Sequence, residues 1–167
     1  MNYDKIVIHD LSADNLNLMP IADGYLTVDA NTKAASCIGC FGCWLKTPGV
    51  CVIKDEFQYL GAIIPQCKEV FIVSQNCYGG YSPNIKKVLD RSIAASLPFF
   101  TYRGGKTHHI SRYKNRPECT VFLYGQISDF EKQIANELVK ANGINMAWQN
   151  ATLSFLDDAQ QLREVWQ

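Results

Sequence analysis

The sequence lacks an excess of charge of either sign, a long hydrophobic run and an even number of cysteines. Sixteen basic and sixteen acidic residues cancel to a formal net charge of zero, so no global field attracts nucleic acid or an anionic membrane. No apolar run approaches the ~20 residues of a membrane-spanning helix, and the N-terminus does not resemble a signal peptide. Seven cysteines, an odd number, argue against a disulfide scaffold. These absences predict a soluble cytoplasmic protein without nucleic-acid or membrane partners.

The chain also lacks internal repeats, low-complexity segments and linkers. Its 167 residues therefore predict one domain, spanning 1–167, with one well-filled core. Apolar runs predict strands at Lys5–His9, Tyr25–Asp29, Val70–Val73 and Thr120–Tyr124, and within Asn145–Phe155. Helical patterns fall between them, at Ser12–Leu18, from Asp55 through Ile64, at Pro83–Ala95, from Ser128 or Asp129 to Gly143, and at Asp157–Trp166. The alternation predicts an α/β fold, a doubly wound five-stranded parallel sheet between two helical layers.

The most informative stretch, Glu69–Arg91, joins a buried strand to a loop and a well-marked helix start. Val70–Val73 is apolar and mostly β-branched, as in a strand covered on both faces. Ser82 is a good N-cap, Pro83 suits the first helical position, and Arg91 is expected to face water on the polar side of the helix. Ligands of open α/β sheets bind beyond the carboxyl ends of the strands, so the intervening loop is a candidate binding site.

The loop offers polar groups, small residues and aromatic rings. Tyr78 and Tyr81 are suited to pack on a planar ring, and backbone amides near Gly79 and Gly80 to bond its polar edge. The candidate ligand-binding residues are Ser74, Gln75, Asn76, Cys77, Tyr78, Gly79, Gly80, Tyr81 and Ser82. Residue types alone explain the loop equally well as a Gly-rich connection whose tyrosines cap the core.

The runs YGGYSP at Tyr78–Pro83 and KVLDR at Lys87–Arg91 carry a family resemblance. They are similar to the flavin-ring loop, and to the helix after it, in the flavodoxin-like NAD(P)H-dependent FMN reductase family. The resemblance implies the strand order 2-1-3-4-5, an FMN cofactor, NAD(P)H as reductant and a homodimer. It implies that Tyr124 and Gly125, after the fourth strand, meet the flavin's edge, although a plain strand-to-helix turn explains them equally well. Trp44 is expected to cover the other face of the ring.

Four cysteines form a second candidate site: Cys37, Cys40, Cys43 and Cys51. Two C-x-x-C steps that share a cysteine, with a fourth eight residues on, suit one iron–sulfur cluster, and the pattern resembles that of iron–sulfur flavoproteins. Zinc also accepts four thiolates, though usually from two separated knuckles. Flavin reductases without a cluster carry a stretch similar to Gly42–Cys51, so a metal-free cysteine loop beside the flavin is favoured over a [4Fe-4S] cluster. A redox thiol pair and inert packing are further alternatives.

The turn after the first strand departs from the resemblance. Flavodoxin-like proteins usually hold the FMN phosphate there, where bare N–H groups and a helix dipole attract anions. This chain has the run HDLSAD at His9–Asp14. Ser12 can still bind a phosphate, but Asp10 and Asp14 repel it and no glycine permits close approach. Three outcomes stay open: FMN held weakly, a phosphate bound by other groups, and no flavin at all.

The basic segment 103–116 is a candidate for those other groups. It contains Arg103, Lys106, Arg112, Lys114 and Arg116, together with His108 and His109. Positive charge of this density suits the phosphates of FMN or NADPH. A solvated hairpin or a dimer contact is the preferred interpretation.

Together these patterns predict an FMN-dependent oxidoreductase that passes electrons from NAD(P)H to a small acceptor such as a quinone, a flavin or an electron carrier. The flavin carries the chemistry, so no side chain is assigned a catalytic role. The competing hypothesis is a flavodoxin-fold binding or regulatory module that has lost tight FMN binding. Its basis is the acidic turn at Asp10–Asp14.

Overall fold

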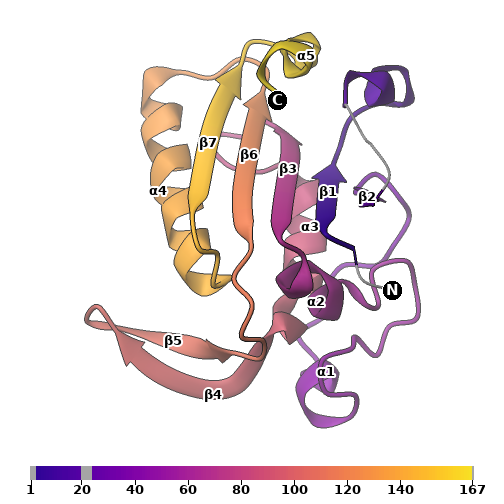
Figure 1. Ribbon diagram of the computed structural model, residues 1–167, viewed down its shortest axis with the longest axis vertical. Coiled ribbons are helices and arrows are strands. Elements are labelled where there is room, and N and C mark those ends of the chain that lie inside the picture. The colour runs from indigo at the N-terminus through magenta and orange to yellow at the C-terminus, as the bar shows by residue number, and fades with distance from the viewer. Residues whose placement is uncertain (1–2, 20–23, 167) are drawn as a thin grey trace.

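Five parallel strands form the main sheet. The computed structural model describes residues 3–19 and 24–166. The strands are β1 (Lys5–His9), β2 (Tyr25–Asp29), β3 (Glu69–Gln75), β6 (Glu118–Tyr124) and β7 (Ala151–Leu156), in the order β2-β1-β3-β6-β7 (Figure 1). Counted along the chain this is the order 2-1-3-4-5, so the expected doubly wound, flavodoxin-like α/β fold is confirmed.

The inner strands are apolar on both faces, which explains their place in the sheet. Ile6, Val7 and Ile8 of β1 are fully buried, and so are Ile72 and Val73 of β3. Continuous β-branched runs suit parallel strands that are covered from both sides. Because the pairings are parallel, β1, β3 and β6 all end at the same side of the sheet, which we call the carboxyl edge.

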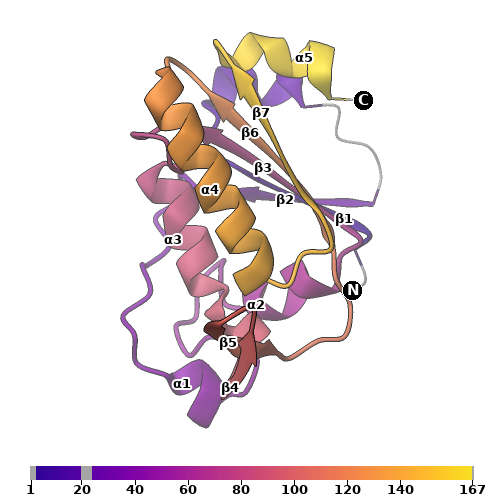
Figure 2. The same ribbon diagram turned by 90° about the vertical axis from the view of Figure 1, so that its left-hand side faces the viewer.

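One face of the sheet is covered by three helical segments (Figure 2). They are α2 (Leu60–Ile63) with η2 (Ile64–Gln66), α3 (Pro83–Arg91) with η3 (Ile93–Ala95), and α4 (Asp129–Asn145). The start of α3 is as expected, since Ser82 Oγ accepts the N–H of Ile85 at 3.3 Å. A capping box formed by Ser128 and Glu131 begins α4. No helix within 3–19 and 24–166 is long and apolar enough to cross a membrane.

Two expected helix boundaries are wrong. Asp55 does not begin a helix, because α2 starts only at Leu60. Its carboxylate accepts the Phe57 N–H at 3.1 Å, as a cap would, and also binds Arg91. Gly143 does not end α4, which continues to Asn145. A Cβ on Gly143 would touch the Ala151 Cβ at 3.4 Å. This distance is an ordinary van der Waals contact, so Gly143 lies inside α4 where the helix packs on the start of β7.

The other face of the sheet has a thinner cover. It consists of η1 (Ala13–Leu18), η4 (Ala159–Gln161) and α5 (Leu162–Val165), so the helix expected over Asp157–Trp166 is split into two short pieces. Trp166 completes this layer. Its ring centroid lies 5.0 Å from that of Phe71 and 5.3 Å from that of Phe122, and all three side chains are buried.

Between η3 and β6 the chain leaves the sheet and forms an antiparallel hairpin of β4 (Ser96–Arg103) and β5 (Lys106–Ser111). Gly104 and Gly105 turn the hairpin with φ angles of +56° and +78°. It lies with α1 (Gly42–Leu45) at the end of the molecule opposite the carboxyl edge (Figure 1). Most of the basic segment 103–116 therefore belongs to a hairpin and is remote from the carboxyl edge.

Replacing Trp166 with alanine is expected to lower the free energy of unfolding by about 3–5 kcal/mol, because it uncovers Phe71 and Phe122 and leaves a cavity on the thin side of the sheet. Val165→Ala is the control, since Val165 is largely exposed, and is expected to cost about 0.5 kcal/mol. Urea unfolding of both variants measures the difference. Equal stability of the two would show that Trp166 does not hold this layer in place.

Candidate functional site

A carboxylate binds the ends of three strands together at the carboxyl edge. Asp10, the residue after β1, accepts the backbone N–H of Gln75 with both oxygens, at 3.1 and 3.0 Å. Its Oδ1 also accepts the hydroxyl of Tyr124 at 3.0 Å. Burial, reinforced by the adjacent Asp10 carboxylate, raises the pKa of Tyr124, so this phenol keeps its proton and donates it. Sequence analysis treated Asp10 only as a source of repulsion and missed this role as an acceptor.

The ring loop, Ser74–Ser82, is a closed turn braced by hydrogen bonds. Cys77 and Gly80 exchange backbone bonds of 3.0 and 2.9 Å, and Tyr78 and Gly79 between them have φ angles of +55° and +80°. These are the dihedral signs of a type I′ turn. A Cβ on Gly79 would come within 2.6 Å of the Glu131 carbonyl oxygen, so only glycine fits where the turn meets α4.

The Asn76 side chain ties this turn to the neighbouring strand end. Its Nδ2 donates to the Gln126 carbonyl at 2.8 Å, and its Oδ1 accepts the N–H of Gly79 at 2.9 Å. The backbone N–H of Asn76 bonds the Tyr124 carbonyl at 2.8 Å, which fixes the loop beside the Tyr124–Gly125 strand end. The N–H groups of Gly79 and Gly80, expected to bond a ligand, donate within the turn instead.

The two tyrosines of the ring loop have opposite environments. Tyr81 is 8% exposed and packs in the core, where its hydroxyl accepts a 3.4 Å bond from Asn142 Nδ2. Ser74 and Ser82 are buried beside it and are joined by a 2.9 Å bond from Ser82 N–H to Ser74 Oγ. Tyr78 is 85% exposed. Of the two expected stacking residues, only Tyr78 presents an open ring face.

The β1–η1 turn does not fit a phosphate. The segment η1 is a 3-10 segment of six residues rather than a long helix. Two donors at this edge, the Gln75 N–H and the Tyr124 hydroxyl, already bind the Asp10 carboxylate. The turn after β1 therefore lacks the features that hold an FMN phosphate, whereas the exposed ring of Tyr78 offers a flat face at the same edge.

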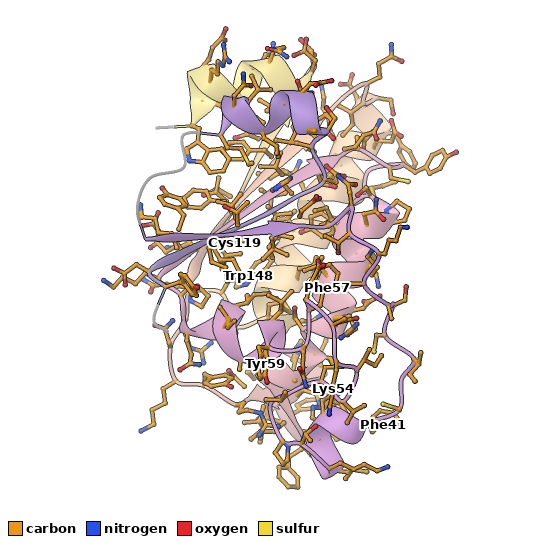
Figure 3. The ribbon with its side chains drawn as sticks, turned by 90° about the vertical axis from the view of Figure 1, so that its right-hand side faces the viewer. Phe41, Lys54, Phe57, Tyr59, Cys119 and Trp148 are labelled. Carbon is orange, nitrogen blue, oxygen red and sulfur yellow. The ribbon has the colours of Figure 1, made fainter. Side chains whose placement is uncertain are left out.

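The cysteine loop, residues 31–59, runs along α3 toward the opposite end of the molecule. Three α3 side chains, at intervals of three and four residues, bind it in succession. The bonds are Asn84 Nδ2 to Asn31 Oδ1 at 2.9 Å, Lys87 Nζ to the Thr32 carbonyl at 2.9 Å, and Arg91 Nη1 to the Ala35 carbonyl. Phe41 and Lys54 lie near α1, and Phe57 lies closer to the sheet (Figure 3).

Arg91 anchors the far end of this loop. Its side chain is fully buried and forms a two-pronged ion pair with Asp55, at 2.8 and 2.6 Å, and a 3.3 Å bond to the Ile53 carbonyl. Hydrogen bonding to Arg91 holds the pKa of Asp55 below its usual range. The expectation that Arg91 faces water is wrong. Arg91 follows buried Val88 by three residues and buried Ile85 by six, so all three lie on the same face of the helix. This spacing could have predicted that Arg91 is buried.

The four cysteines line one cavity of about 700 Å³ beside α3. Cys43 is buried, Cys51 is half-buried, and Cys37 and Cys40 are exposed. Burial raises the pKa of the Cys43 thiol, and the nearby Cys51, Cys37 and Cys40 raise it further. Gly80 and Tyr81 line the same cavity, so it extends to the back of the ring loop. In the described part of the chain no three His, Cys, Asp or Glu side chains are arranged to hold a metal ion.

Trp44 lies against the hairpin rather than on the ring loop. Its indole N–H donates to the Ser96 carbonyl at 3.0 Å. Its ring centroid is 5.5 Å from Phe41 and 4.9 Å from His109. The expected cover for a flavin face is thus placed at the opposite end of α3 from Tyr78.

The comparisons with known proteins bear on the fold. No protein-family model matches the sequence, and no curated protein matches it. Among solved structures, the chain is similar to an FMN-dependent NADH-azoreductase from Bacillus anthracis, determined in complex with FMN. The TM-score is 0.59 at 12% identity, over 98% of this chain and 93% of that one. The chain therefore has a flavodoxin-like α/β fold.

Asp55→Asn is expected to lower the free energy of unfolding at pH 7 by about 3 kcal/mol, because it leaves the buried Arg91 guanidinium without its counter-charge. Pairing lowers the folded pKa of Asp55, so the contribution is complete above the unfolded carboxyl pKa of about 3.9 and is lost as pH falls through the lower folded value. The difference in the free energy of unfolding between wild type and Asp55→Asn should become smaller only below about pH 4.

Urea unfolding between neutral and acid pH measures this gap. Asp90→Asn is the matched control, because Asp90 forms an exposed pair with Lys86 and such pairs contribute about 0.5 kcal/mol. A gap that is as small for Asp55→Asn as for the control, or that persists unchanged in acid, would contradict the assignment of the pair.

Proposed function

We propose that the protein is a flavin-dependent oxidoreductase whose flavin ring stacks on Tyr78. The observation that carries this proposal is the exposed ring of Tyr78, held in the left-handed region on a hydrogen-bonded turn at the carboxyl edge. A non-glycine residue in that region costs about 1–3 kcal/mol, and such strain concentrates in ligand sites. The end-to-end fold likeness to an FMN-dependent NADH-azoreductase supports the same function.

In this function electrons pass from NAD(P)H to a small acceptor such as a quinone, a flavin or an electron carrier. A bound flavin would supply the hydride and electron chemistry. The chain's part is to position the ring. Tyr78 offers it a face, Asn76 keeps the turn fixed against β6, and the Tyr124–Asp10 pair forms the polar boundary next to it.

Tyr78→Ala is expected to weaken flavin binding about fivefold, because contacts between aromatic rings are worth about 0.5–1.5 kcal/mol beyond burial. Tyr59→Ala is the control, since Tyr59 is also exposed but precedes α2. Quenching of riboflavin and FMN fluorescence measures binding, and oxidation of NADH and NADPH with added flavin and several acceptors measures turnover. Background oxidation in every case, or equal flavin binding by the two variants, would count against the proposal.

A second candidate, an iron–sulfur flavoprotein, rests on the position of Cys37, Cys40, Cys43 and Cys51 along one cavity, although no three of these described side chains are arranged to hold a metal ion. Four thiolates are the usual donor set of a [4Fe-4S] cluster, and the buried Arg91 guanidinium at the same cavity would offset part of their negative charge. A bound cluster would supply one-electron transfer. The metal-free cysteine loop remains the alternative for these residues.

After anaerobic reconstitution with iron and sulfide, the cluster candidate predicts broad visible absorption that Cys40→Ser abolishes. Cys40 is exposed, so its replacement should leave the fold intact. Cys77→Ser is the control, because Cys77 belongs to the ring loop, and it should keep the absorption. A colourless reconstituted wild type would favour the metal-free loop. A protein that also ignored every flavin would favour a binding or regulatory module.

A further inference from the structure

We propose that Asp10 makes the carboxyl-edge site selective for a flavin without a phosphate, so that riboflavin binds better than FMN. This inference rests on the proposed flavin function and names the ligand class of the same site. FMN and riboflavin share the ring and the ribityl chain. They differ only in the 5′-phosphate, which makes the turn after β1 the place where the two ligands are distinguished.

The first reason is that two donors at this edge, the Gln75 N–H and the Tyr124 hydroxyl, already bind a carboxylate. A phosphate is held by N–H and O–H groups that point at its oxygens. Here the Gln75 N–H lies 3.1 and 3.0 Å from the two Asp10 oxygens, and the Tyr124 hydroxyl lies 3.0 Å from one of them. The Asp10 carboxylate therefore accepts the hydrogen bonds that an anionic ligand group would otherwise accept. A phosphate at this edge would have to displace it or lie beside it.

The second reason is the charge around the turn. No lysine or arginine occurs between Lys5 and Lys33, while Asp10 and Asp14 both lie in that interval. His9 does not supply a positive charge, because it is almost fully buried and burial lowers its pKa. A phosphate with a charge of about −1.5 to −2 would thus meet carboxylates without a cation from this part of the chain.

The third reason is the backbone. Long helices after the first strand attract anions through their free N–H groups and dipole. The segment η1 has only six residues in 3-10 geometry. The basic hairpin does not compensate, because it lies at the opposite end of the molecule (Figure 1). A neutral ring and ribityl chain encounter none of these obstacles, and Tyr78 remains open to them.

Parallel titrations of wild type, Asp10→Asn and Asp14→Asn with riboflavin and FMN test the proposal by fluorescence quenching. Wild type is expected to bind riboflavin about tenfold more tightly than FMN, the ratio that about 1.4 kcal/mol of repulsion gives. A single amide oxygen in place of Oδ1 can still accept both the Gln75 N–H and the Tyr124 hydroxyl without the charge, and only the bond to Oδ2 is lost. Asp10→Asn should therefore bring the two dissociation constants within about twofold. Asp14→Asn removes an equal charge from the same turn and should keep most of the preference.

A salt titration of the wild type provides the same test without a variant. Raising the salt from about 0.02 to 0.5 M screens charge repulsion, so FMN binding should strengthen while riboflavin binding stays nearly constant. If circular dichroism shows that Asp10→Asn does not fold, the salt titration of the wild type alone tests the selectivity.

Two results would overturn the proposal, and they are distinguishable. If wild type binds FMN more tightly than riboflavin and Asp10→Asn leaves the ratio unchanged, the selectivity is wrong while the flavin function stands. If neither flavin is quenched by the wild type and NAD(P)H oxidation stays at background, both the selectivity and the flavin function fail.

Discussion

The buried ion pair of Arg91 and Asp55 is the constraint on which the arrangement of both candidate sites depends. A guanidinium without exposed surface is costly unless its charge is paired. The cysteine loop pairs the charge through Asp55 and, with the carbonyls of Ala35 and Ile53, gives both Nη groups acceptors, while the buried Nε has no partner among the described residues. The loop therefore contacts the end of α3 at two points, first at Ala35 and again at Ile53 and Asp55. Residues 37–51, between these two points, form a turn that faces the cavity.

Helix α3 connects the two sites mechanically. Its first turn is capped by Ser82, which closes the ring loop, and its last residue is Arg91, which holds the cysteine loop. Nine helical residues separate the two ends by roughly 14 Å. The cavity beside the helix is lined by cysteines and by Gly80 and Tyr81. A change in either loop therefore acts on the same helix and the same cavity.

The parts of the fold that local sequence determines were predictable. The β-branched run of β3 and the Ser82–Pro83 start of α3 each carry their own signal, and both are confirmed. The incorrect predictions concern residues whose structure depends on contacts with distant parts of the chain. Asp55 resembles a helix cap but binds a residue 36 positions away. The spacing of Tyr78 and Tyr81 did not reveal that one ring is exposed and the other buried, because that depends on how the turn packs on α4.

The short segment after β1 explains two otherwise unrelated features. A long helix there would cover one face of the sheet and would direct free N–H groups toward the carboxyl edge. With only η1 in that position, part of the cover comes from the far end of the chain, where Trp166 stacks on Phe71 and Phe122. In the absence of such N–H groups, the Asp10 carboxylate binds two strand-end donors, the Gln75 N–H and the Tyr124 hydroxyl. The thin layer and the acidic edge thus follow from the same shortened connection.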